Sequence, residues 1–287
     1  MKTFKIIMNV FGIIGASILS IFLVLALAAT SFVYAASSFF QGENIFKIIA
    51  SVDYSAIISS EMDEIDGEIV NELMQSEMME EIVDLCVENI FDAIEENDIN
   101  RTVSPDDVED IMEEHEDDIK KMVEEYVGDT IPLTEEILDE MTDALIQEYS
   151  IEIAESLPTV YDLGLDKDTL NIIMNLKNGT YFKTALAIAV VLTILVMLCQ
   201  VMRFKGFMWI GVDYLVASVL TLISSAVIKT INLGELLDVD ALAYPVLNTI
   251  TGIIASDIVK GVIIMAVSGV VFIVVFIVGR KLLKNKK

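Results

Sequence analysis

Oxygen-bearing side chains recur at regular intervals between residues 98 and 109, with a spacing that could surround a hard cation. They are Asp98, Asn100, Thr102, Ser104, Asp106 and Glu109, at positions 1, 3, 5, 7, 9 and 12 of the run. Calcium takes about six to eight oxygen ligands from carboxylates, amides, hydroxyls and carbonyls. The spacing therefore indicates a possible Ca²⁺ site, with Glu109 as its bidentate ligand.

This run resembles the calcium-binding loop of EF-hand proteins over twelve residues, and it departs from that loop at two positions. Val103 stands where the loop requires glycine for its sharp bend, and Pro105 stands where an aliphatic residue is usual. Ser104 followed by Pro105 is also a typical helix start. The leading interpretation is a capped connection between two helices without a bound cofactor. Calcium binding by Asp98, Asn100, Thr102, Asp106 and Glu109 is the alternative.

Asp213 is the second candidate, because it interrupts an otherwise uncharged stretch between Lys205 and Lys229. Ionisable residues within membrane spans usually face the bundle interior or water, and they are often functional. Residues at four-residue steps continue the same helix face, namely Ala217, Thr221 and Ser225. Asp213 could act in transport within a helix bundle. The alternative is a structural ion pair with Lys205 or Arg203 near the inner end of the span.

The remaining chemistry of the chain is sparse. His115 is the single histidine and lies between Ile111 and Ile119 on an apolar stripe, which favours a core position over a metal ligand. Residues 161–166 (YDLGLD) resemble fragments of intramembrane aspartyl protease motifs, but their charged surroundings favour a turn followed by a helix cap. No nucleotide-binding loop, nucleophile elbow or zinc-protease motif occurs. The sequence therefore predicts a protein without enzymatic activity.

Composition divides the chain into two parts. The 287 residues are 54% hydrophobic with a mean hydropathy of +0.63, yet the formal net charge is −27. Residues 41–181 contain 40 acidic and 6 basic residues, whereas the rest of the chain contains 5 acidic and 12 basic residues. One water-soluble globule cannot combine these properties. The acidic excess also argues against nucleic acid as a partner.

Four segments are apolar and long enough to cross a bilayer. Between flanking charges, the uncharged stretches cover residues 6–42, 184–202, 206–228 with the exception of Asp213, and 261–279. A hydrocarbon core of about 30 Å needs roughly 20 residues of helix. With four spans, the basic clusters at residues 2–5, 203–205 and 280–287 fall on one side. The positive-inside rule makes this the cytoplasmic side, so both termini are expected there and residues 41–181 outside.

The first span permits an alternative and carries a packing signal. A cleaved secretory signal is compatible with the two lysines, the apolar run and the small residues after Val33. The apolar run, however, is about twice as long as the usual 7 to 15 residues. A retained helix is the preferred interpretation. Gly12, Ala16 and Ser20 recur every four residues and predict close packing against another helix.

The acidic block reads as helical throughout. Apolar residues at three-to-four spacing predict helices over 69–94, over 105–126 after Ser104, from Thr134 onward, and over about 166–176. Pro245 is expected to begin a further amphipathic helix that leads into the fourth span. About 140 residues suffice for the block to bury a core of its own.

The predicted protein is an all-α, multi-pass plasma-membrane protein with four transmembrane helices. Its expected parts are a first span in 1–40, an acidic extracytoplasmic domain in 41–181, spans in 182–204 and 205–228, an outer loop in 229–259, and a last span with basic tail in 260–287. This plan is similar in topology to permeases of the FtsX and MacB type, without a shared motif. The leading functional hypothesis is partner binding, sensing or assembly through the acidic domain, with divalent cations as possible ligands. The alternative is a transport or channel subunit that uses Asp213.

Overall fold

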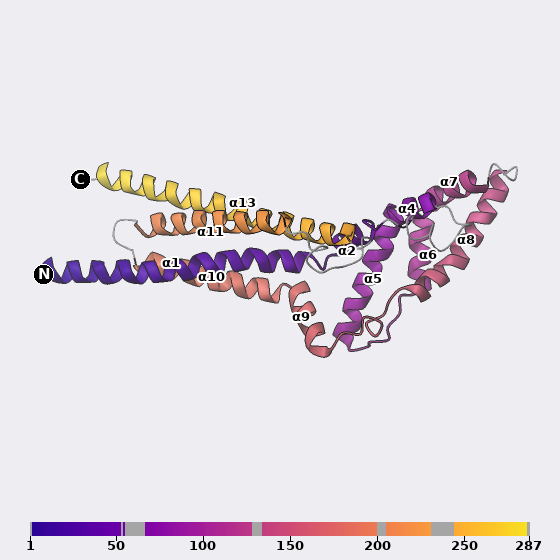
Figure 1. The fold of residues 1–287 in the computed structure, drawn as a ribbon, viewed down its shortest axis with the longest axis horizontal. Helices are drawn as coiled ribbons and strands as arrows, with labels where there is room; N and C mark the ends of the chain where they lie inside the picture. Colours follow the sequence, from indigo (N-terminus) through magenta and orange to yellow (C-terminus); the bar gives the residue numbers. More distant parts are fainter. Residues whose placement is uncertain are drawn as a thin grey trace. The chain divides into compact units, whose positions relative to one another are not determined.

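A computed structural model describes residues 2–52, 54, 67–127, 134–199, 205–230 and 244–285 (Figure 1). It gives side-chain positions from Gly12 onward at the N-terminus. Every regular element in the described ranges is a helix. The chain forms two compact units, which are described separately. Unit 1 comprises residues 1–40 and 175–287, and unit 2 comprises residues 41–174.

Unit 1 contains the four helices that are long and apolar enough to cross a membrane. These helices are α1 (Lys2–Ser38), α10 (Thr180–Cys199), α11 (Lys205–Thr230) and α13 (Tyr244–Asn285). Helix α1 packs against the other three, and α11 packs along α13. The helix predicted to begin at Pro245 and the fourth span form the single 42-residue helix α13. The segments 200–204 and 231–243 lie outside the described residues.

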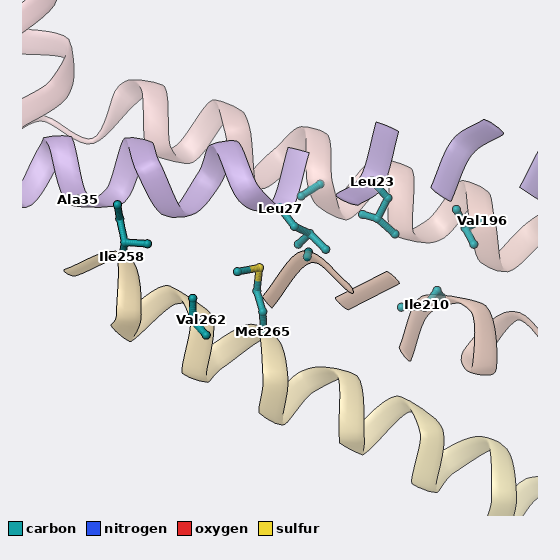
Figure 2. Packing of buried hydrophobic residues seen from close by; sticks show 10 residues of the cluster. Leu23, Leu27, Ala35, Val196, Ile210, Ile258, Val262 and Met265 are labelled. Carbon is teal, nitrogen blue, oxygen red and sulfur yellow. The ribbon is translucent and has the colours of Figure 1, made fainter. Parts of the chain in front are cut away.

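The core of unit 1 is a narrow seam along one face of α1. Leu23, Leu27 and Ala35 of α1 are buried, and Figure 2 shows Ala35 pointing toward Ile258 of α13. Val196 of α10, Ile210 of α11 and Met265 of α13 complete the seam. The opposite faces of these helices expose large apolar side chains. Such exposure is unfavourable in water and favourable against lipid tails.

Unit 2 consists of shorter amphipathic helices. They are α2 (Gly42–Ile49), α4 (Gly67–Met74), α5 (Glu77–Glu96), α6 (Pro105–Glu114), α7 (Glu116–Val127), α8 (Glu135–Ser156) and α9 (Lys167–Lys177). The last three residues of α9 belong to unit 1. Side-chain hydrogen bonds cap the starts of α5 and α8. The hydroxyl of Thr134 accepts a hydrogen bond from the Ile137 amide at the start of α8. Helix α5 ends at Asn97, which adopts the left-handed conformation with φ of 57°.

Two helices predicted as continuous are each broken in the structure. The helix predicted over 69–94 ends at Met74, and Ser76 begins α5 by accepting a hydrogen bond from the Met79 amide. The helix predicted over 105–126 breaks at His115, which separates α6 from α7. Both α6 and α7 pack on α8, and the break lets each half turn its apolar face toward α8. Apolar periodicity alone did not reveal either break.

The core of unit 2 gathers apolar side chains from α5, α6, α7 and α8. Ile82 and Val108 are fully buried in it, and Ile146 of α8 is nearly so. A second, smaller cluster joins Ala93 of α5, Val160 and Leu170 of α9. The acidic side chains therefore surround a packed core, as amphipathic helices require.

Candidate functional site

Two buried carboxylates in unit 1 form the candidate site, and Asp213 is the first. Its carboxylate oxygen Oδ2 accepts a hydrogen bond of 2.8 Å from the hydroxyl of Ser20. Asp213 is 5% exposed and Ser20 is 7% exposed. The bond joins α1 to α11 across the seam. A buried carboxylate is costly unless it is hydrogen-bonded or paired, so Ser20 is the group that accommodates it.

The structure places Asp213 away from the basic side chain predicted as its structural partner. Lys205, at the first position of α11, is exposed and forms no ion pair with Asp213. Arg203 lies outside the described residues. The eight residues between Lys205 and Asp213 correspond to about 12 Å along the helix. Within the described ranges, the partner of Asp213 is therefore a hydroxyl of α1.

Asp257 of α13 is the second buried carboxylate, and it is 3% exposed. Its oxygen Oδ2 accepts a hydrogen bond from Ser38, the last residue of α1, and its oxygen Oδ1 lies 2.6 Å from the Nζ atom of Lys260. The 18 residues from Ser20 to Ser38 correspond to about 27 Å of helix. This distance is close to the roughly 30 Å thickness of a hydrocarbon core. Serines of α1 thus hold carboxylates of two different helices near opposite ends of the bundle.

The α11 face predicted to continue from Asp213 is buried along its length. Ala217, Thr221 and Ser225 are each at most 1% exposed. Ser225 donates a hydrogen bond of 2.9 Å to the Ala255 carbonyl of α13. Thr221 has no hydrogen-bond partner for its hydroxyl within the described part of the chain. A line of polar groups therefore runs along α11 between the level of Asp213 and that of Ala255.

Small residues let the helices of unit 1 approach one another closely. A Cβ atom built on Gly12 would lie 2.9 Å from the Cys199 carbonyl of α10, and Ala16, one turn further, is fully buried. The stripe Gly12, Ala16 and Ser20 thus faces neighbouring helices. Gly211 of α11 and Gly269 of α13 form a tighter crossing, where a Cβ on either would lie less than 3.0 Å from the carbonyl oxygen of the other.

The segment with calcium-like spacing is an exposed connection in unit 2. Asp98, Asn100, Thr102 and Asp106 are exposed, whereas Val103 is buried. Helix α6 begins at Pro105, so Glu109 lies in its second turn. Arg101 crosses back toward α5, where its guanidinium hydrogen-bonds Asn89, Asp92 and Glu96. The calcium site remains a prediction on these five residues.

Glu109 instead lines an acidic hollow of about 390 Å³ between α6, α7 and α8. Its other acidic residues are Glu113, Glu116 and Asp143. Lys120 bridges Glu116 and Asp139, and these hydrogen bonds raise the pKa of its ammonium group. Within the described ranges, no three Asp, Glu, His or Cys side chains stand close enough together to hold a metal ion. His115 lies with its two ring nitrogens 3.5 Å and 4.0 Å from Glu81 and Asp118.

Sequence reasoning missed Ser38 and Asp257, although a signal was present. Asp257 falls within the apolar stripe of Ile250, Ile254 and Ile258, where an acid is unexpected. Ser38 extends the same face of α1 that carries Ser20. An acid on an apolar stripe needs a hydrogen-bond donor, and a serine on the small-residue stripe of another helix can provide one. Asp257 and Ser38 could have been paired on this ground.

Comparison with models of protein families, with curated proteins and with solved structures finds no match to this chain. Two carboxylates held by serines can brace a helix bundle, or they can exchange a proton or a cation. Each carboxylate has a serine hydroxyl within hydrogen-bond distance, and Asp257 also has the ammonium group of Lys260.

Proposed function

We propose that this chain is a non-enzymatic, multi-pass protein of the plasma membrane that presents its acidic helical part outside the cell for partner binding. The N- and C-termini are cytoplasmic in this proposal, and residues 41–181 are extracytoplasmic. The three basic clusters at residues 2–5, 203–205 and 280–287 support this orientation, because four spans bring them to one side.

The observation that carries the proposal is the pair of serine bonds at Asp213 and Asp257. Helix α1 leads directly into the acidic part of the chain, and it is fastened to α11 at one level and to α13 about 27 Å further along. A helix tied at two levels is a rigid support. A rigid support suits a protein whose task is to hold a soluble domain at the membrane.

The charge of the acidic part indicates the kind of partner. Residues 41–181 contain 40 acids against 6 bases, and most acids in the described ranges are exposed. Such a surface attracts basic proteins over a Debye length of about 8 Å at physiological salt. We therefore infer a protein partner with a basic surface, with divalent cations as secondary ligands.

Crosslinking in native membranes tests this function directly. A photocrosslinker placed at the exposed Glu148 of α8 should capture a basic protein, and the yield should fall as salt is added. The same crosslinker at the exposed Val216 of α11 is the matched control, because it faces lipid in this proposal. Equal captures at both positions, or a capture at Glu148 that is insensitive to salt, would contradict the proposal.

Labelling with an impermeant thiol reagent tests the orientation independently. In a Cys86→Ala, Cys199→Ala background, Glu148→Cys should react on intact cells, and Lys205→Cys should react only after permeabilisation. Reaction of both variants on intact cells would place them on the same side of the membrane. That result would exclude the four-span orientation.

A second candidate function is transport, and the buried polar line from Asp213 to Ser225 favours it. Carboxylates in membrane bundles often carry protons or cations. In reconstituted vesicles with an imposed membrane potential, the transport hypothesis expects proton or cation flux that is lost in Asp213→Asn. The binding hypothesis expects no flux above that of protein-free vesicles from either the wild type or the variant.

A further inference from the structure

Unit 2 exposes large apolar side chains in two of its loops and on the helix that follows one of them. This apolar patch consists of Ile99, Tyr161, Leu163, Leu165 and Ile172, which all stand out of the surface. Tyr161 is 68% exposed and Ile172 is 50% exposed. Scattered apolar residues are normal on a protein surface, but large apolar side chains exposed in two loops that a backbone hydrogen bond joins, and on the helix that follows, indicate an interaction site.

The patch rests on an ordered base. The amide of Tyr161 donates a hydrogen bond of 3.0 Å to the Ile99 carbonyl and so ties the two loops together. The small core of Ala93, Val160 and Leu170 lies beneath them. The loop is stiffened by Asp162, which accepts hydrogen bonds from the amide and hydroxyl of Thr159. The apolar side chains are therefore held outward by fixed backbone geometry.

The chain itself keeps this region close to the membrane. Helix α9 ends at Lys177, and the apolar span α10 begins at Thr180. Three peptide steps of about 3.8 Å limit the distance between these ends to roughly 11 Å. Gly179 adopts a left-handed φ of 65°, which ends α9 and turns the chain before α10.

The charge pattern changes at the same place. Residues 53–156 contain 36 acids and 3 bases, whereas residues 157–183 contain three of each, namely Asp162, Asp166 and Asp168 with Lys167, Lys177 and Lys183. Hydrogen bonds from Thr159 lower the pKa of Asp162, and the amide of Thr169 lowers that of Asp166, so both acids stay ionised. The loop and helix that carry Tyr161, Leu163 and Leu165 therefore have no net charge, which suits zwitterionic headgroups better than anionic lipid.

We propose that the apolar patch docks on the outer surface of the lipid bilayer, with Tyr161, Leu163 and Leu165 inserted at the level of the headgroups. Tyrosine is a preferred side chain at that depth because its ring is apolar and its hydroxyl remains hydrated. The docking rests on the four-span orientation proposed above. It holds the acidic domain at the membrane and leaves the acidic surfaces of α7 and α8 free for a partner.

Quenching by brominated phosphatidylcholine tests the docking in the full chain. The protein has a single tryptophan, Trp209 in α11. In nanodiscs of brominated lipid the emission of Trp209 should be quenched, which confirms that the spans lie in the bilayer. In a Trp209→Phe background, Tyr161→Trp should also emit at shorter wavelength and be quenched. Tyr149→Trp on α8 is the matched control, because Tyr149 is likewise an exposed tyrosine of unit 2, and it should not be quenched.

The outcomes separate the two proposals. If brominated lipid did not quench Trp209, the proposal that the four helices span the membrane would be overturned. Quenching at Trp209 without quenching in Tyr161→Trp would overturn only the docking. A blue-shifted but unquenched signal from Tyr161→Trp would assign the patch to a protein contact, including a second copy of the chain, and would equally overturn it. Replacement of Leu163 and Leu165 by serine should abolish the quenching of Tyr161→Trp while leaving the circular dichroism unchanged.

Discussion

Ser20 of α1 and Asp213 of α11 are 193 positions apart in the chain and are joined by a buried hydrogen bond of 2.8 Å. The serine comes from a stripe of small residues, and the aspartate comes from an apolar span. Each feature is explained by the other. The small residues allow the helices to approach, and the hydroxyl provides a partner for a carboxylate that lipid could not solvate.

Removal of the Ser20 hydroxyl should destabilise unit 1. Ser20→Ala leaves Asp213 buried without its donor, and interhelical hydrogen bonds in membranes contribute about 0.6–2 kcal/mol. We expect a loss of that size in the free energy of unfolding of the full chain in detergent. Asp213→Asn should cost less, because the amide still accepts from Ser20 and carries no charge.

Ser17→Ala is the control for this prediction. Ser17 lies on the same helix, and its hydroxyl bonds only to the Ile13 carbonyl of its own helix. Its loss should leave the stability almost unchanged. Equal effects of Ser17→Ala and Ser20→Ala would show that the Ser20–Asp213 bond does not brace the bundle.

A methyl group at the crossing of α11 and α13 should also destabilise the bundle. In Gly211→Ala the new Cβ would lie 2.6 Å from a side-chain atom of Ile273 and 2.8 Å from the Gly269 carbonyl. Overpacking of this kind costs about 1–3 kcal/mol. Gly252→Ala on α13 meets nothing within 4 Å and should be neutral or slightly stabilising. Thermal unfolding of both variants checks the difference. A melting temperature of Gly211→Ala equal to that of the wild type would contradict the close contact between α11 and α13.

Much of the helical architecture follows from the sequence, because spans and amphipathic helices are governed by local periodicity. The four apolar helices were predicted from the spacing of charges. The helix starts at Ser104 and Thr134 were predicted from their capping residues. The caps themselves differ in detail. The side chain of Thr134 accepts a capping hydrogen bond, whereas that of Ser104 makes none, although Pro105 occupies the first helical position after it.

The candidate site was only half predictable, because a hydrogen bond between helices depends on register. Asp213 stands out in sequence, but its partner is one of several serines in α1 that look alike there. Asp257 was missed because it lies in the predicted outer loop, on an amphipathic helix where a charged side chain is expected to face water. The break at His115 likewise depends on how α6 and α7 pack on α8, which no local pattern records.

Neutralisation of Asp84 should stabilise unit 2 at neutral pH. Partial burial, followed by the charges of Glu88, Glu43 and Glu81, raises the pKa of this carboxyl above its usual value of 3.8. A raised pKa means that the folded state binds the proton more tightly, so ionisation opposes folding. The penalty is complete above the folded pKa and disappears as the pH falls below 3.8. Asp84→Asn should therefore raise the melting temperature near pH 7 and lose this advantage at low pH.

Asp92→Asn provides the comparison of opposite sign. Asp92 lies on the same helix but 3.4 Å from the guanidinium of Arg101, so its charge is compensated. Its neutralisation should lower the melting temperature slightly or not at all near pH 7, as expected for an exposed pair. Identical shifts for Asp84→Asn and Asp92→Asn would mean that general net charge, and not the local cluster, governs the effect.

Divalent cations should stabilise unit 2 mainly by screening its charge. Carboxylates crowded on a small domain repel one another, and this repulsion falls as the ionic strength rises. We expect the melting temperature of the full chain to rise with Ca²⁺, with Mg²⁺ and with monovalent salt at equal ionic strength. A specific site would behave differently, because a cation that binds only the folded state adds stability that saturates with its concentration.

Glu109→Gln removes the predicted bidentate ligand, and Glu148→Gln on α8 removes one exposed charge elsewhere. Both variants should respond alike under screening. A preference for Ca²⁺ over Mg²⁺ that disappears in Glu109→Gln and persists in Glu148→Gln would instead establish a calcium site at residues 98–109.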